Sequence, residues 1–102
     1  MCTNTNRKPL DYPTSFDDLP VEQQQALCRW IKKNLRKRQT PLYLWTSYGL
    51  KHLFEFDAGF YIDNGAFKGA MLRCCFQPAH PLERNWCFGI SSRSPAFKKR
   101  GL

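Results

Sequence analysis

Residues 29–38 read RWIKKNLRKR, and this stretch predicts both how the chain packs and what it contacts. Six of these ten residues are Lys or Arg. On a helix, with about 100° per residue, cations gather on one face and apolar side chains on the opposite face. The cations are Arg29, Lys32, Lys33 and Arg36, and the apolar residues are Leu27, Trp30, Ile31 and Leu35. We therefore expect one side to be buried, with Trp30 in the core, and the other to meet an anionic partner.

The composition of the chain agrees with that expectation. Its 102 residues include 16 basic and 8 acidic ones, which gives a formal net charge of +8. Such an excess favours polyanionic partners, namely DNA, RNA, a nucleoprotein or an acidic protein face, although many small proteins are basic only for solubility. Further cations of the candidate nucleic-acid surface are Lys37 and Arg38, with Lys98, Lys99 and Arg100 near the C-terminus as a second clamp.

The length and the apolar content predict one folded domain. Residues 1–15 are polar with two prolines and are expected to form a loose arm, residues 16–92 the domain, and residues 93–102 a basic tail. No apolar run is long enough to span a bilayer, and no secretory leader is recognisable. We expect a cytoplasmic protein without a membrane partner.

Local patterns predict an α+β fold that is mostly helical, with three helices and one or two short strands. The first helix is expected from Asp17 or Asp18 to about Arg38, the second from a cap at Thr46 or Ser47 to about Phe56, and the third from a cap at Asp63 or Asn64 to about Cys75. Asp63-Asn64-Gly65 could instead turn a β-hairpin. Asn85–Ser91 alternates apolar and polar residues as a strand does, and Leu42–Trp45 is expected to be a strand or extended.

A second candidate surface lies on the predicted second helix. Tyr48, Lys51, His52 and Glu55 follow the spacing of one helix face, opposite the apolar Leu50, Leu53 and Phe54. A face that mixes an aromatic ring, both charges and an imidazole suits contact with a protein partner or a second copy of the chain. A small enzyme that uses Tyr48, His52 and Glu55 is an alternative, but no nucleophile elbow, phosphate loop or paired-carboxylate motif accompanies them.

The five cysteines are expected to be reduced thiols. Their number is odd, and Cys74 and Cys75 are adjacent. Cys74, Cys75, His80 and Cys87 invite comparison with a zinc site, but the spacing lacks the knuckle of two cysteines separated by two residues. We expect no metal and no other cofactor.

A helix-turn-helix DNA-binding regulator is a further alternative, built from the second and third predicted helices. Their connection is longer than the usual turn of three or four residues. The outer face of the third helix offers Ala66, Gly69, Leu72 and Arg73, which is poor in the amides that read base edges. Gly65 and Gly69 could instead allow a close backbone approach or tight helix packing.

The segment Thr46–Phe76 followed by Asn85–Ser91 resembles a group of short proteins encoded by phages, plasmids and conjugative elements of Gram-positive bacteria. The words that carry the resemblance are SYGLKH, FYIDNGAFKGAML and NW-x-F-x-I-S, which cover under half of the chain. Orphan proteins of such elements include anti-CRISPR inhibitors. The resemblance thus implies a non-catalytic protein of a mobile genetic element that binds nucleic acid or a Cas-type nucleoprotein. Because the chain is basic, mimicry of DNA charge is not expected.

Overall fold

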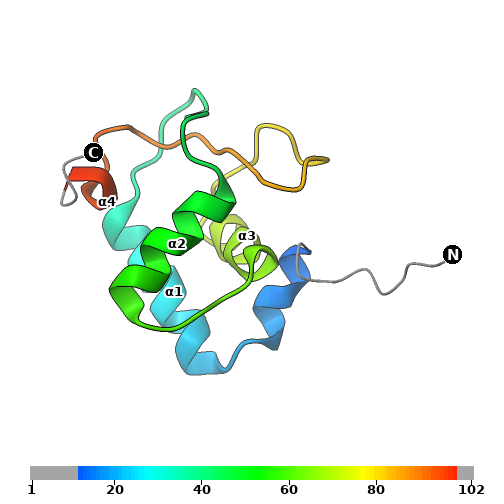
Figure 1. Cartoon of the computed structure of the whole chain (residues 1–102). Coiled ribbons are helices and arrows are strands. Elements are labelled where there is room, and N and C mark those ends of the chain that lie inside the picture. Colours follow the sequence, from blue (N-terminus) through cyan, green and yellow to red (C-terminus); the bar gives the residue numbers. More distant parts are fainter. Residues whose placement is uncertain (1–11, 99–102) are drawn as a thin grey trace, which may run out of the picture.

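The computed structural model describes residues 12–98, which form several helices joined by irregular segments (Figure 1). The helices are the 3-10 helix η3 (Pro13–Asp18) and the α-helices α1 (Val21–Asn34), α2 (Ser47–Ala58), α3 (Asn64–Arg73) and α4 (Pro95–Lys98). α3 packs against η3, α1 and α2, while α4 packs against α1. The architecture is therefore a small, mostly helical globule with three main helices.

The predicted strand at Asn85–Ser91 is wrong as regular structure, because residues 12–98 contain only two isolated β-bridges, Lys37 with Ile90 and Pro78 with Phe88. The alternation behind the prediction is real, since the side chains of Trp86, Phe88 and Ile90 are buried. Leu42–Trp45 likewise forms no strand.

The backbone of residues 86–91 explains the missing strand. The amides of Arg38, Leu42 and Ser47 donate to the carbonyls of Gly89, Phe88 and Trp86, at 3.0, 2.9 and 2.6 Å. These donors are four and five residues apart, whereas their acceptors are one and two apart. The opposing chain therefore winds past the extended segment instead of pairing with it residue by residue, and no ladder forms.

α1 confirms the predicted buried face, because Leu27, Trp30, Ile31 and Leu35 are all in the core. Its predicted bounds are wrong at both ends. Asp17 and Asp18 belong to η3, and Pro20 separates η3 from the start of α1 at Val21. α1 ends at Asn34, after which Leu35 is extended with φ −121° and ψ 135° and is buried.

α2 and α3 begin where the sequence predicts. The Thr46 hydroxyl accepts from the Gly49 amide, and the Asp63 carboxylate accepts from the Ala66 amide at 2.7 Å. α2 ends at Ala58, and Gly59 follows it with a φ of 84°, a left-handed conformation that glycine adopts without steric cost. The helical interpretation of residues 64–73 is confirmed over the hairpin alternative.

Every residue of α3 from Asn64 to Met71 is buried, which small side chains make feasible. A Cβ atom added at Gly69 would lie 2.2 Å from the carbonyl oxygen of Pro13 and 2.6 Å from Cβ of Phe16. Gly69 thus allows η3 to pack directly on α3, which is the tight-packing alternative for this glycine. It also places residues 13–15 in the packed domain, although the sequence assigned them to the arm.

The two predicted terminal segments are only partly described. Residues 1–11 of the arm, and Lys99 and Arg100 of the tail, lie outside the described residues. Within the predicted basic tail, Pro95–Lys98 form α4, and its Ala96 and Phe97 are buried. Within residues 12–98, no helix has the length and apolar character that crossing a bilayer requires.

Candidate functional site

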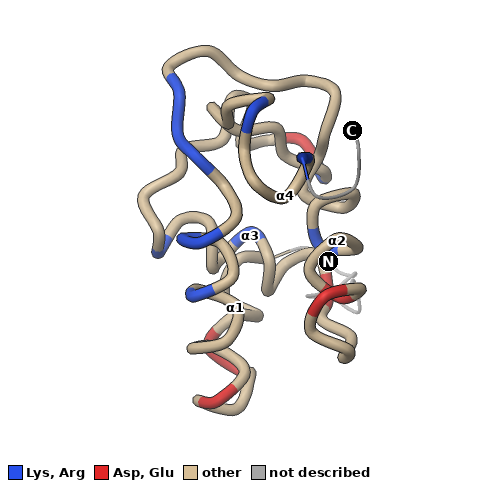
Figure 2. Tube along the Cα trace, turned by 90° about the vertical axis from the view of Figure 1, so that its left-hand side faces the viewer, with Lys and Arg blue, Asp and Glu red and all other residues tan. Residues whose placement is uncertain are grey.

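The basic surface is built by the C-terminal half of α1 and the segment that follows it. Arg29, Lys32 and Lys33 are exposed on α1, and Arg36, Lys37 and Arg38 are exposed on the extended segment. Figure 2 shows the basic residues gathered at this end of α1, with acidic residues at its other end. The predicted cations therefore lie near one another, but on a helix end and an extended strand of chain, not on one continuous helix.

Arg36 and Arg38 bind the protein's own backbone. Nη1 of Arg36 donates to the carbonyls of Lys32 at 3.0 Å and Lys33 at 3.1 Å, which are left without helical partners where α1 ends. Arg38 donates to the carbonyls of Thr40 and Pro41, at 2.9 and 3.1 Å. These two guanidinium groups thus shape the end of α1 and the turn after it, although both side chains are exposed.

The remaining cations are less constrained. The Lys37 ammonium lies 4.9 Å from the ring centroid of Phe76. The side chains of Arg29, Lys32 and Lys33 make no hydrogen bond or ion pair with the other described residues. They consequently present their full charge to solvent, and Lys32 and Lys33 lie in the last turn of α1, where the helix dipole favours cations.

One carboxylate lies at the edge of this surface. Asp57 shares a hollow of about 390 Å³ with Arg29, Trp30 and Lys33. Its Oδ2 accepts from the Trp30 indole at 2.7 Å, so the acid is tied to the buried face of α1. Lys98 is exposed on α4, which packs against α1, and its role as part of a second clamp stays a prediction.

The second predicted surface, on α2, differs from the exposed stripe that the spacing suggested. Tyr48 and His52 are exposed, but Lys51 is buried at 3% exposure and the Glu55 side chain is only 17% exposed. The difference arises because the chain after α2 folds back, and Ile62 and Tyr61 cover Lys51 and Glu55.

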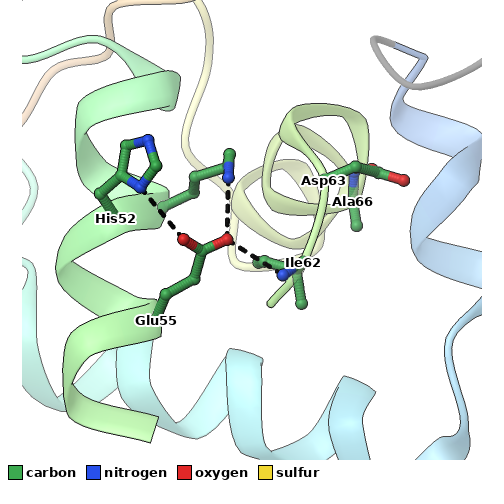
Figure 3. A network of polar contacts seen from close by, with 6 residues as sticks. His52, Glu55, Ile62, Asp63 and Ala66 are labelled. Carbon is green, nitrogen blue, oxygen red and sulfur yellow. Dashed lines mark hydrogen bonds and ion pairs between the residues drawn. The ribbon is translucent and has the colours of Figure 1, made fainter. Parts of the chain in front are cut away.

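Glu55 is the centre of a polar network on this side of α2 (Figure 3). Its Oε2 accepts from the Lys51 ammonium at 2.8 Å and from the Ile62 amide at 3.1 Å, and its Oε1 lies 3.0 Å from Nδ1 of His52. Burial raises the pKa of Glu55, but the bonds from Lys51 and Ile62 and the nearby charges outweigh burial, so the pKa is lowered overall. Glu55 is therefore a carboxylate at neutral pH.

A pocket of about 370 Å³ opens beside this network. Its lining comprises Tyr48, Lys51, His52, Tyr61, Asp63, Asn64, Arg84 and Asn85. Tyr61, Asn64, Arg84 and Asn85 were not predicted as site residues, because they lie 10 to 37 positions from Tyr48 or Lys51 in segments that only folding brings together. Asn64 bonds to both the carbonyl of Arg84 and the side chain of Asn85, which fixes one wall of the pocket.

The pocket contains one arrangement suited to proton transfer. The Glu55 carboxylate holds Nδ1 of His52, which leaves Nε2 directed away from Glu55 (Figure 3). The described lining offers no Ser, Thr or Cys, so a nucleophilic side chain of those types is not part of it.

The structure describes four of the five cysteines, Cys28, Cys74, Cys75 and Cys87, and they differ in burial. Cys74 is buried beside Cys28, and burial together with that neighbouring thiol raises the pKa of Cys74 to about 11. Cys75 is exposed, and Cys87 is half-buried with a pKa that burial and Glu83 raise. Among residues 12–98, no group of three His, Cys, Asp or Glu side chains converges as metal ligands would.

A helix-turn-helix arrangement finds no support in the packing. The recognition helix of such a motif must enter the major groove of DNA with one face exposed. α3 would have that role, but it is buried from Asn64 to Met71, and only Leu72 and Arg73 at its end are exposed.

No protein-family model matches the chain, and neither curated proteins nor solved structures show significant similarity to it. The resemblance of Thr46–Phe76 to proteins of mobile elements therefore stays a hypothesis.

Proposed function

We propose that this chain is a non-catalytic nucleic-acid-binding protein that contacts the phosphate backbone of DNA or RNA through the basic end of α1. The observation that carries the proposal is the exposed, unpaired state of Arg29, Lys32 and Lys33, continued by the exposed cations of residues 36–38. Exposed cations without a contact inside the protein need not break one in order to bind a phosphate. Each phosphate contact also releases condensed counterions.

The experiment is a measurement of oligonucleotide affinity by fluorescence anisotropy at several salt concentrations. The variant is Lys32→Ala with Lys33→Ala, because both side chains are exposed and neither caps a helix. Loss of two phosphate contacts should lower the slope of log affinity against log salt by roughly 1.4–1.8, depending on whether the strand is single or double. Arg36 is left intact because it binds carbonyls at the end of α1.

A charge-matched variant controls for the general effect of net charge. Gln25→Glu with Arg73→Ala lowers the net charge by the same two units, but at exposed positions in the N-terminal half of α1 and at the end of α3. It should keep most of the slope. Equal slopes for the two variants would show that the surface of α1 is only solvated and that the proposal is wrong.

The nucleic acid can be free or part of a nucleoprotein in a bacterial cell. The resemblance to proteins of phages and plasmids makes a Cas-type complex with its guide RNA the first nucleoprotein to test. An anti-CRISPR would restore plasmid transformation in cells whose RNA-guided nuclease targets that plasmid. The Lys32→Ala/Lys33→Ala variant should lose this protection, while Gln25→Glu/Arg73→Ala should keep it.

Acid–base catalysis is a second candidate, favoured by one observation: the His52–Glu55 contact beside a pocket. A carboxylate that orients an imidazole is the arrangement of many general bases. If the protein cleaves RNA at this site, His52→Gln should abolish cleavage and leave the thermal unfolding temperature nearly unchanged. A cleavage activity that His52→Gln retains would belong to a contaminant or to another site.

A further inference from the structure

The pocket on α2 has two tyrosine rings that converge on one ammonium group. Nζ of Lys51 lies over the ring of Tyr48 at 5.4 Å from the centroid and over the ring of Tyr61 at 4.5 Å. Tyr48 comes from α2 and Tyr61 from the segment before α3, and their side chains are 51% and 67% exposed. Two aromatic rings from different segments therefore border the same opening and keep much of their surface accessible to a ligand.

Lys51 supplies a charged donor at the base of this opening. Its side chain is buried, and the contact to Glu55 at 2.8 Å uses one of the three N–H donors of an ammonium group. The other donors lie near the two tyrosine rings. A ligand atom that accepts a hydrogen bond from this ammonium gains a charge-assisted bond in a partly desolvated place.

The acidic groups near the pocket are directed to the protein itself. Glu55 is contacted by Lys51, His52 and the Ile62 amide, and the Asp63 carboxylate accepts from the amide of Ala66 as the cap of α3. The lining otherwise presents Lys51, Arg84 and His52 together with the tyrosines and two asparagines. This chemistry fits a planar ligand that carries hydrogen-bond acceptors and negative charge.

We infer that the pocket binds one unstacked nucleotide of a single strand, with its base against Tyr48 and Tyr61 and an acceptor on the Lys51 ammonium. The pocket volume of about 370 Å³ lies in the range of small-ligand sites. Aromatic side chains that stack on single bases are the usual device for holding single strands. The inference rests on the proposed binding of nucleic acid and specifies a single-stranded form of it.

The test is a titration of the full chain with adenosine and uridine monophosphates, followed by isothermal calorimetry and by NMR shifts of the tyrosine and His52 resonances. Tyr61→Ala and Tyr48→Ala should each lower the affinity about tenfold, because each removes one stacking surface. Tyr61→Phe keeps the ring and should keep the affinity. Tyr43→Ala is the control, since Tyr43 is a tyrosine of similar exposure, 60%, outside the pocket.

A mononucleotide separates this inference from the proposed role of α1. It carries one phosphate and cannot follow the row of cations on α1, so Lys32→Ala with Lys33→Ala should leave its affinity unchanged. Absence of saturable binding at millimolar mononucleotide overturns the pocket, as does binding that neither tyrosine variant weakens. Tyrosine-dependent binding of an acidic peptide, without any mononucleotide binding, would show that the ligand is not a nucleotide. None of these results would change the salt dependence that we assign to α1.

Discussion

α1 and α3 pack against each other but use their side chains in opposite ways. α1 buries Leu27 and Ile31 on one side and exposes Lys32 and Lys33 on the other. α3 is buried on all sides between Asn64 and Met71, including its lysine and both glycines. The outer face of α1 is therefore available to a binding partner, whereas the side chains of α3 serve the packing of the core.

The buried lysine of α3 illustrates that commitment. Lys68 is 3% exposed, and its ammonium lies 4.5 Å from the ring centroid of Trp86, so it serves a contact inside the protein. The lysines at the end of α1 are solvated and available to an anion. The lysine of α3 and the lysines of α1 thus differ in role because of where their helices lie.

The largest loss of stability should follow from a substitution in α3 that creates a cavity in the core. Phe67 is fully buried, and its ring meets the ring of Trp30 edge-on at 6.4 Å between centroids. Phe67→Ala should lower the free energy of unfolding by about 3–5 kcal/mol, measured by urea denaturation. Tyr43→Ala, at an exposed position, should change it by less than about 0.5 kcal/mol. Similar losses for both variants would mean that α3 is not the centre of the core.

The next largest effect should come from one added methyl group. Gly69→Ala places a Cβ atom 2.2 Å from a backbone oxygen of Pro13, so η3 must move away from α3. We expect a loss of about 3 kcal/mol, at the upper end for overpacked cores, although alanine in a helix is intrinsically favoured over glycine by about 1 kcal/mol. The sign of the change therefore decides whether packing or helix propensity dominates at this position.

Gly49→Ala in α2 is the comparison variant. Its new Cβ atom would lie 3.1 Å from a ring carbon of the Trp45 side chain, which can shift more easily than backbone. A loss clearly smaller than that of Gly69→Ala is expected in the same denaturation experiment. If Gly49→Ala costs as much, the close approach of η3 to α3 has no special importance.

The sequence predicts the helices better than their surroundings. The caps at Thr46 and Asp63 are local hydrogen bonds between residues three positions apart, and in each case the sequence predicted the cap to within two adjacent residues. The end of α1 was wrong because it depends on a distant partner: the Arg36 amide donates to the Ser94 hydroxyl at 2.9 Å, and Leu35 enters the core. Helix periodicity continues to Arg38 and carries no sign of that contact.

In the candidate sites, too, local features could be predicted from the sequence, whereas features that depend on distant segments could not. The exposure of Lys32 and Lys33 follows from the pattern of one helix, so it could be predicted. The burial of Lys51 could not, because it depends on how residues 61–62 fold back over α2. The pocket walls at Arg84 and Asn85 are likewise distant in sequence, and their polar character alone did not mark them among the other loop residues.

A substitution of Glu55 tests how much a mostly buried charge contributes to stability, for comparison with the exposed charges of α1. Glu55→Gln leaves the Lys51 ammonium without its ionic partner, and we expect a loss of about 2 kcal/mol at pH 7. Because the fold lowers the pKa of Glu55 from its ordinary 4.5, the carboxylate stabilises the protein above that pH. This stabilisation is lost as the pH falls through the lowered pKa.

The measurement is the free energy of unfolding of both proteins between pH 3 and pH 7. The difference between wild type and Glu55→Gln should shrink steadily below pH 4.5, the ordinary pKa of Glu55. A difference that stays constant over this range would show that the cost of the substitution does not come from loss of the ionised carboxylate.

The smallest effect on stability is expected for the Lys32→Ala/Lys33→Ala variant that should lose nucleic-acid affinity. Both side chains are exposed and form no hydrogen bond within the described residues, so little packing is lost. Removing cations from the last turn weakens the interaction with the helix dipole, while alanine slightly favours the helix, and the two effects oppose each other. The free energy of unfolding should therefore change by less than about 0.5 kcal/mol.

Leu27→Ala on the opposite face of α1 is the matched variant, and it should cost about 2–5 kcal/mol because Leu27 is fully buried. If the lysine variant were destabilised to a comparable extent, the outer face of α1 would be part of the packing, as α3 is, and its cations would need no ligand to explain them. A stable lysine variant with a reduced salt slope would instead separate stability from binding within a single helix. That separation is what distinguishes a surface retained for a partner from one retained for the fold.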